Sequence, residues 1–187
     1  MRIIAGKFRS RRLASLKGDE IRPTSDRLRE TLFNVLTPGN PAALEGSVWL
    51  DLFAGTGAVG IEALSRGAAM VYFVESSKDS VELIRRNLQP LGVSGKFQVL
   101  QQKAEMAISA LDRQQLRPDF IFLDPPYALR DAYRTTLEAL GNSALIEKAL
   151  VIVEHERKND LSEKFGALQR NRKLEQGYAA LSFYRRT

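Results

Sequence analysis

The sequence predicts a doubly wound α/β fold, in which helices cover both faces of a mostly parallel sheet. After residue 46, short apolar segments alternate with amphipathic segments, as in a chain of β–α–β units. Most of the apolar segments lack polar alternation, which is typical of strands buried on both faces. The chain has 187 residues, 44% hydrophobic and 27% charged, which suits one globular domain with a short appendage.

Hydrophobic spacing places the elements along the chain. A helix is expected from the N-cap candidates Thr24, Ser25 and Asp26 to Leu36, because apolar side chains recur on one face. Five apolar strands follow, at Val48–Phe53, Ala69–Val74, Phe97–Leu100, Phe120–Leu123 and Leu150–Val153. The helices expected between them are Gly57–Arg66, Ser77–Leu91, Ala104–Arg113 and Arg130–Leu140. The segments Leu168–Leu174 and Tyr178–Tyr184 flank a turn and predict an antiparallel C-terminal hairpin, which gives seven strands in all.

The positive charge is concentrated at the start of the chain. The net charge is +6, and the first 29 residues hold nine basic and three acidic side chains, so the whole excess lies there. Such a cluster favours contact with a polyanion, most often nucleic acid, although a solvated tail or a mitochondrial transit peptide would also be basic. Gly6, Phe8 and Gly18 favour an ordered, hairpin-like segment. We therefore predict a basic arm and helix over residues 1–45 and a second unit over residues 46–187.

The rest of the composition excludes several classes of protein. The chain has no Cys and a single His, His155, so disulfides, thiol nucleophiles and Cys-ligated zinc are excluded, and no metal site is expected. No apolar run approaches the roughly 20 residues that cross a bilayer, and no apolar segment follows the basic start as in a signal peptide. A cytoplasmic protein without membrane contact is expected, and nothing in the sequence requires more than a monomer.

A glycine-rich segment follows the first strand and begins the next helix. It reads Asp51-Leu-Phe-Ala-Gly55-Thr-Gly57-Ala-Val-Gly60, a pattern that serves nucleotide cofactors in general, nicotinamide cofactors included. Asp51 would disfavour a pyrophosphate but could pair with the amino group of S-adenosylmethionine, and Glu75 could accept hydrogen bonds from ribose hydroxyls. We therefore expect S-adenosylmethionine there rather than a nicotinamide. The alternative for the glycines is a tight turn without a ligand.

A second motif, Asp124-Pro125-Pro126-Tyr127, ends the fourth strand. Two prolines impose a rigid, extended exit at the carboxyl edge of the sheet, where open α/β sheets bind ligands. Asp124 and the carbonyl of Pro125 can accept the two N–H bonds of an exocyclic amino group, and Tyr127 can stack on its base. The motif therefore predicts methylation of a nucleobase amino group; a rigid turn with a capping Asp is the alternative.

With both motifs in place, the sequence resembles the bacterial small-subunit ribosomal RNA methyltransferase D family. The resemblance extends to Arg2-Ile-Ile-Ala-Gly-Lys7, to Arg22-Pro-Thr-Ser-Asp-Arg27 and to Arg29-Glu-Thr-Leu-Phe-Asn34. It implies a Rossmann-like methyltransferase fold and formation of N2-methylguanine in 16S ribosomal RNA, naked or in a ribonucleoprotein particle.

The resemblance also implies roles for individual residues. The catalytic residues would be Asp124, Pro125, Pro126 and Tyr127. The cofactor would be held by Asp51, Phe53, Gly55, Thr56, Gly57 and Glu75. The RNA would be held by Lys7, Arg9, Arg11, Arg12, Arg22, Thr24 and Arg27. In one departure, Lys103 stands where the family usually has an acidic or amide residue that bonds adenine. Either Gln102, Glu105 or a backbone group replaces this contact, or adenine binding is weaker.

Two further residues have structural interpretations, and three other functions compete with methylation of ribosomal RNA. We expect His155 to be a structural hydrogen-bonder rather than a general base, and Trp49 to lie in the core. A DNA adenine-N6 or cytosine-N4 methyltransferase would use the same motif but would need a target-recognition domain. A nicotinamide-dependent oxidoreductase leaves the Asp124 motif and the basic arm unexplained. A non-catalytic RNA-binding assembly factor on the same fold stays open because of Lys103.

Overall fold

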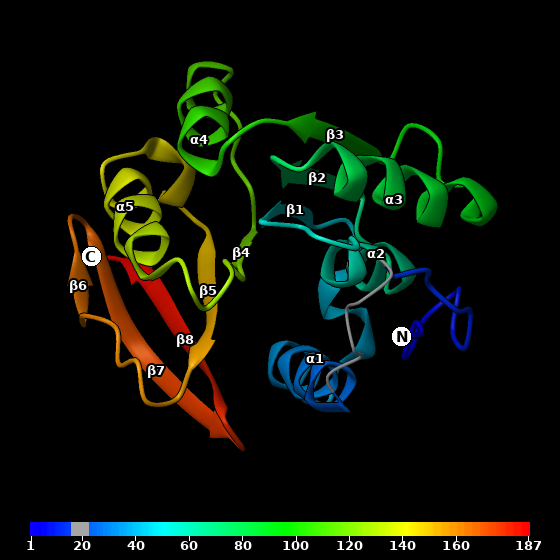
Figure 1. Cartoon of the computed structure of the whole chain (residues 1–187), viewed down its shortest axis with the longest axis horizontal. Helices are drawn as coiled ribbons and strands as arrows, with labels where there is room; N and C mark the ends of the chain where they lie inside the picture. Colours follow the sequence, from blue (N-terminus) through cyan, green and yellow to red (C-terminus); the bar gives the residue numbers. More distant parts are fainter. Residues whose placement is uncertain (16–22) are drawn as a thin grey trace.

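The chain folds around one eight-stranded sheet with the strand order β3-β2-β1-β4-β5-β8-β7-β6 (Figure 1). The computed structural model describes residues 1–15 and 23–187. The first five strands are parallel, and the last three are antiparallel to their neighbours. The strands are β1 Val48–Leu52, β2 Met70–Glu75, β3 Phe97–Gln101, β4 Phe120–Leu123, β5 Leu150–Glu156, β6 Lys164–Phe165, β7 Leu168–Gln176 and β8 Ala179–Arg186.

Helices cover both faces of the sheet, as the apolar strands require. The α-helices are α1 Pro23–Leu36, α2 Ala58–Ser65, α3 Lys78–Leu88, α4 Ala104–Arg113 and α5 Arg130–Gly141. Short 3-10 turns lie at Pro41–Leu44, Gln89–Leu91 and Ala144–Ile146. Buried residues of α1, α2 and α3 pack on one face around Trp49, and those of α4 and α5 pack on the other. Trp49 stacks between Phe33 and Phe120, so its predicted place in the core is confirmed.

The predicted fold class is confirmed, with one correction to the strand count. The sheet has eight strands rather than seven, because Lys164 and Phe165 pair with Gln169 and Leu168. A two-residue strand has no periodicity, so hydrophobic spacing does not detect it. The C-terminal hairpin is present and longer than expected, reaching Gln176 on one side and Arg186 on the other.

The start of α1 also differs from the expectation. The helix begins at Pro23, so Thr24, Ser25 and Asp26 lie within its first turn instead of preceding it. Proline is well suited to a first helical position, because its fixed φ matches the helix and it has no N–H to leave unpaired. Gly18 and Arg22 lie outside the described residues.

The N-terminal arm is an ordered part of the same core. Arg2 and Arg12 form an antiparallel bridge, in keeping with a hairpin-like segment. Ile3, Phe8 and Leu13 are buried in the cluster that also contains residues of α1, α2 and α3. Across the described part of the chain, no helix is long and apolar enough to cross a membrane.

Candidate active site

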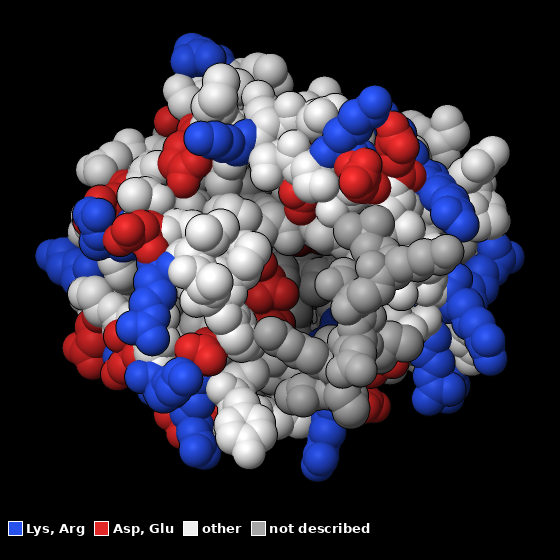
Figure 2. All heavy atoms as spheres, in the orientation of Figure 1, with Lys and Arg blue, Asp and Glu red and all other residues white. Residues whose placement is uncertain are grey.

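A cavity of about 830 Å³ opens at the carboxyl ends of the parallel strands. It lies where strand order reverses, between β1 and β4, which is the usual ligand position in open α/β sheets. Four carboxylates line it, those of Asp51, Glu75, Asp124 and Glu154, and Arg29 is the basic side chain among its described lining residues. Figure 2 shows acidic side chains at the wall of a central hollow on this face. The cavity therefore favours a cationic ligand.

The glycine-rich loop is folded as its sequence predicts. Phe53 at φ +61° opens it, and Gly55 and Gly57 also adopt left-handed conformations. Such a conformation is strained for Phe53, and residues held this way cluster at functional sites. Gly60 is needed for a different reason, because a Cβ there would lie 2.3 Å from the ring of Phe73. Only glycine therefore lets α2 pack this closely on the sheet.

Asp51 lies at the floor of this loop and is almost completely buried. Its Oδ2 accepts a hydrogen bond from the N–H of Gly60 at 3.0 Å. Burial, together with the nearby carboxylates of Asp124 and Glu75, raises the pKa of Asp51 to about 7, although the hydrogen bond from Gly60 opposes the shift. Because this pKa lies above the ordinary value, the contribution of Asp51 to stability is present at low pH and is lost as pH rises through about 7.

Glu75 at the end of β2 fixes the loop against the next strand. Its Oε2 accepts a hydrogen bond from the N–H of Gly55 at 2.9 Å, and its Oε1 accepts one from the N–H of Ser77 at 2.8 Å. Each carboxylate oxygen has a further lone pair for a ligand hydroxyl. Glu75 therefore both shapes the loop and presents acceptors to the cavity.

A side cavity of about 300 Å³ adjoins the main one and shares Phe53, Glu75, Ser76 and Leu129 with it. Gln102, Lys103 and Glu105 line its other side. Lys103 is exposed at the N-cap of α4, and Glu105 Oε1 accepts bonds from the hydroxyls of Thr135 and Thr136, both at 3.2 Å. The size and position of this cavity suit a planar ring next to a ribose.

The residues Asp124 to Tyr127 line the main cavity directly beyond β4. Pro125 is buried, and its carbonyl oxygen accepts a hydrogen bond from the Tyr133 hydroxyl at 3.1 Å. Burial and the charge of Asp124 raise the pKa of Tyr133, so its hydroxyl stays a donor. Tyr133 thus orients a carbonyl of the motif. The sequence pattern does not predict this role, because Tyr133 lies on the apolar face of α5.

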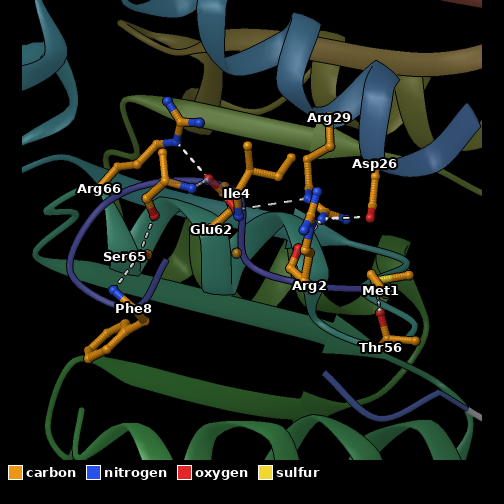
Figure 3. Close-up of polar contacts among 12 residues, drawn as sticks. Met1, Arg2, Ile4, Phe8, Asp26, Arg29, Thr56, Glu62, Ser65 and Arg66 are labelled. Carbon is orange, nitrogen blue, oxygen red and sulfur yellow. Dashed lines mark hydrogen bonds and ion pairs between the residues drawn. The ribbon is translucent and has the colours of Figure 1, made fainter. Parts of the chain in front are cut away.

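The basic arm docks on α2 through one buried carboxylate, that of Glu62 (Figure 3). Its two oxygens accept hydrogen bonds from the N–H groups of Ile4 and Ala5, at 2.8 and 3.0 Å. Arg66 Nε lies 2.8 Å from Oε1, and Arg29 Nε lies 3.9 Å from Oε2. The sequence did not predict these roles for Glu62 and Arg29, although Glu62 is the one charged residue within Ala58–Ser65.

Further contacts hold the arm at the rim of the cavity. The hydroxyl of Ser65 donates to Ala5 O at 2.6 Å and accepts the N–H of Phe8 at 2.9 Å. Asn87 of α3 accepts the N–H of Ala14 and donates to the carbonyls of Ala14 and of Thr56 in the glycine-rich loop, the last at 3.0 Å. Met1 lines the cavity next to Thr56. One face of the arm therefore forms part of the cavity wall.

The predicted RNA-binding side chains lie on the outer face of this arm and on α1. Lys7, Arg9, Arg11, Arg12 and Arg27 are all exposed. In Figure 2, basic side chains gather on the side of the molecule where the arm lies in Figure 1. Arg22 lies outside the described residues, and the structure describes only the backbone of Thr24, within α1.

His155 is separate from this site. It is fully buried, with Nε2 2.9 Å from Ser182 Oγ and Nδ1 2.9 Å from Glu156 O. Burial lowers its pKa, so it is neutral near pH 7. The neighbouring Glu154 lines the cavity, and successive residues of a strand point to opposite faces, so His155 points away. In the described part of the chain no group of acidic or His residues is arranged to hold a metal ion.

Comparisons with known proteins agree with this architecture. The family model described as "Conserved hypothetical protein 95" matches residues 1–185. Ribosomal RNA small subunit methyltransferase D of Haemophilus influenzae is 37% identical over 161 residues, covering 86% of this chain and 81% of that protein. The protein of the same name from Escherichia coli K12 is 35% identical over 187 residues, covering 100% and 90%. The solved structure of Escherichia coli yhhF has a TM-score of 0.81 at 32% identity, covering 100% of this chain and 97% of that one.

Proposed function

The chain belongs to the Conserved hypothetical protein 95 family. From its relatives that are named ribosomal RNA small subunit methyltransferase D, and from the geometry of the site, we propose that it methylates N2 of a guanine in 16S ribosomal RNA, with S-adenosylmethionine as the cofactor. We propose further that it acts as a monomer in the cytoplasm, on RNA that is naked or in a ribonucleoprotein particle. The single observation that carries the proposal is that Asp124–Tyr127 and the acid-lined glycine-rich loop open into one cavity.

The residues present fit the cofactor. Its ammonium group would pair with Asp51, its ribose hydroxyls with Glu75, and its adenine would lie in the side cavity beside Phe53, with Gln102 or Glu105 as the acceptor that replaces the one lost at Lys103. Gly55, Thr56 and Gly57 would let the backbone approach it closely. The cofactor carries a carboxylate too, and Arg29 is the cation among the described lining residues.

The chemistry of the target follows from Asp124 to Tyr127. When bound, S-adenosylmethionine supplies an electrophilic methyl group. Asp124 and the Pro125 carbonyl would each accept a hydrogen bond from one N–H of the guanine amino group. These bonds would reduce the delocalisation of the nitrogen lone pair into the ring, so the nitrogen would become more nucleophilic. Tyr127 would stack on the guanine, which must leave its own stack to enter the cavity. Tyr133 keeps the Pro125 carbonyl in place.

The affinity for the cofactor product should depend on pH through Asp51. Only the ionised carboxylate pairs with an ammonium group, so affinity for S-adenosylhomocysteine should rise about five- to tenfold between about pH 6 and 7.5, as Asp51 loses its proton near pH 7. Isothermal titration calorimetry measures the affinity for S-adenosylhomocysteine at each pH. The Asp51→Asn protein controls for titration of the ligand itself, and an identical pH profile in both proteins would show that Asp51 does not hold the ammonium group.

The arm and α1, residues 1–45, are the proposed RNA-contact unit, and residues 46–187 the catalytic unit. Replacing Arg9, Arg11 and Arg12 together by Gln should weaken RNA binding and lower the slope of log affinity against log salt by about 2–3, because fewer counterions are released. Filter binding between about 50 and 200 mM salt measures that slope. The matched control replaces the exposed cations Arg113, Arg134 and Lys148. Equal slopes for the two triple variants would place the arm away from phosphates.

The proposed function is tested by transfer of a tritiated methyl group from S-adenosylmethionine. The acceptors are 16S ribosomal RNA, small-subunit particles from cells that lack the gene, and plasmid DNA. Nucleoside analysis should find the label in N2-methylguanosine from the RNA. Label in DNA would identify an adenine or cytosine methyltransferase. No label in any acceptor, with S-adenosylhomocysteine still bound, would favour the assembly-factor alternative.

A further inference from the structure

Among the large hydrophobic side chains of the described residues, the most exposed one lies in the turn between β7 and β8. Tyr178 is 89% exposed, against 62% for Met106 and 54% for Leu129. Gln176 pairs with Ala179, so Gly177 and Tyr178 alone form the connection, and Gly177 supplies the left-handed φ of +61° that a two-residue turn needs. The turn thus needs nothing from the side chain of Tyr178, which packs against almost nothing.

This turn follows directly on the two strands that form one wall of the cavity. Glu154 of β5 and Leu181 of β8 pair with each other, and both line the cavity. Three residues further along each strand, Arg157 donates its N–H to the carbonyl oxygen of Tyr178 at 2.8 Å. Three residues of strand span about 10 Å, so the turn lies about that distance beyond Glu154 and Leu181. Figure 1 shows the turn at the end of the sheet away from α4.

The surroundings of Tyr178 suit a nucleic acid. Arg157 and Lys158 follow β5 and are exposed, and Lys158 Nζ also lies 3.6 Å from Glu156 Oε1. Exposed aromatic side chains among cations are the usual platforms for unpaired bases, because every base has a face on which to stack. A tyrosine also has few rotatable bonds, so it loses little entropy when it makes such a contact.

We infer that Tyr178 is a positioning residue that stacks on an RNA base next to the guanine held in the cavity. The inference rests on the proposed function and deepens it, since it assigns the β7–β8 turn to the same RNA substrate. The inference also gives a reason for the exposed ring of Tyr178. When the guanine flips into the cavity, its neighbour in the RNA loses a stacking partner, and an aromatic face about 10 Å from the cavity wall would replace that partner.

The test compares Tyr178→Ala with Tyr178→Phe and Tyr178→Trp, which keep an aromatic face. Tyr178→Ala should raise the KM for naked 16S ribosomal RNA, and its Kd by fluorescence anisotropy, about tenfold, with affinity for S-adenosylhomocysteine unchanged. The Phe and Trp variants should stay within about twofold of the wild type. Met106→Ala, on α4, is the control for loss of an exposed apolar side chain.

Three results would overturn the inference. These are an unchanged RNA affinity in Tyr178→Ala, an equal loss in Tyr178→Phe, which would indicate a hydroxyl contact, and a loss seen only with protein-containing particles, which would indicate a protein partner. A wild-type protein that methylates no RNA would instead contradict the proposed function. The anisotropy comparison separates the two, because it requires no methyl transfer.

Discussion

The Asp124→Ala protein should lose methyl transfer by about 100- to 1,000-fold while binding S-adenosylhomocysteine almost as tightly as the wild type. Asp124 lies beyond β4, at the part of the cavity assigned to the target base, whereas the cofactor is assigned to Asp51, Glu75 and the glycine-rich loop. Its proposed bond to the amino group strengthens as positive charge develops on the nitrogen. Removing it should therefore lower kcat and kcat/KM together.

Single-turnover transfer to 16S ribosomal RNA, with calorimetry of S-adenosylhomocysteine on the same samples, separates the two effects. Asp79→Ala is the control, because Asp79 is an exposed acid in the first turn of α3. Loss of affinity in proportion to loss of rate would assign Asp124 to cofactor binding. Loss of Asp124 also lowers the pKa of Asp51, which is a further reason to expect that ligand affinity near pH 7 is retained.

The second large effect is expected on stability, from Glu62→Ala. Glu62 is 0% exposed, accepts bonds from two backbone N–H groups of the arm and lies between Arg29 and Arg66. Removing one partner of a buried ion pair leaves charges and N–H groups without partners, which costs about 3–5 kcal/mol. Urea denaturation should show this decrease in the free energy of unfolding.

The matched control for Glu62 is Glu82→Ala on the next helix. The side chain of Glu82 is 62% exposed and pairs with Lys78 at 3.9 Å, so its removal should cost less than about 0.5 kcal/mol. The Glu62→Ala protein should also become sensitive to proteolysis within residues 1–15, as the arm loses its attachment. A change in unfolding free energy below about 1 kcal/mol would show that the attachment of the arm does not depend on the Glu62 carboxylate.

Elements that bury a regular apolar pattern could be predicted closely from the sequence. The bounds of Ala104–Arg113 and Phe120–Leu123 are those expected, because their patterns are local and clear. The sheet edge that gathers Asp51, Glu75 and Asp124 also followed, since the carboxyl ends of parallel strands meet. The assignment of these residues to cofactor and base stays a proposal.

Long-range polar contacts could not be predicted in the same way. Glu62 binds residues 57 and 58 positions away, and Asn87 binds Ala14 across 73. Periodicity reports which face of an element is buried but not which distant backbone groups will meet a polar side chain. An isolated charged residue in an apolar helix, as Glu62 is, signals a buried partner without identifying it.

The side chain of Asn87 connects the arm to the glycine-rich loop. One carboxamide bonds both Ala14, in the arm proposed to contact RNA, and the carbonyl of Thr56, in the loop proposed to hold the cofactor. If bound RNA displaces the arm, the hydrogen bonds available to the loop change as well. The two binding equilibria would then be linked, so that RNA would change the affinity for the cofactor by the same factor by which the cofactor changes the affinity for RNA.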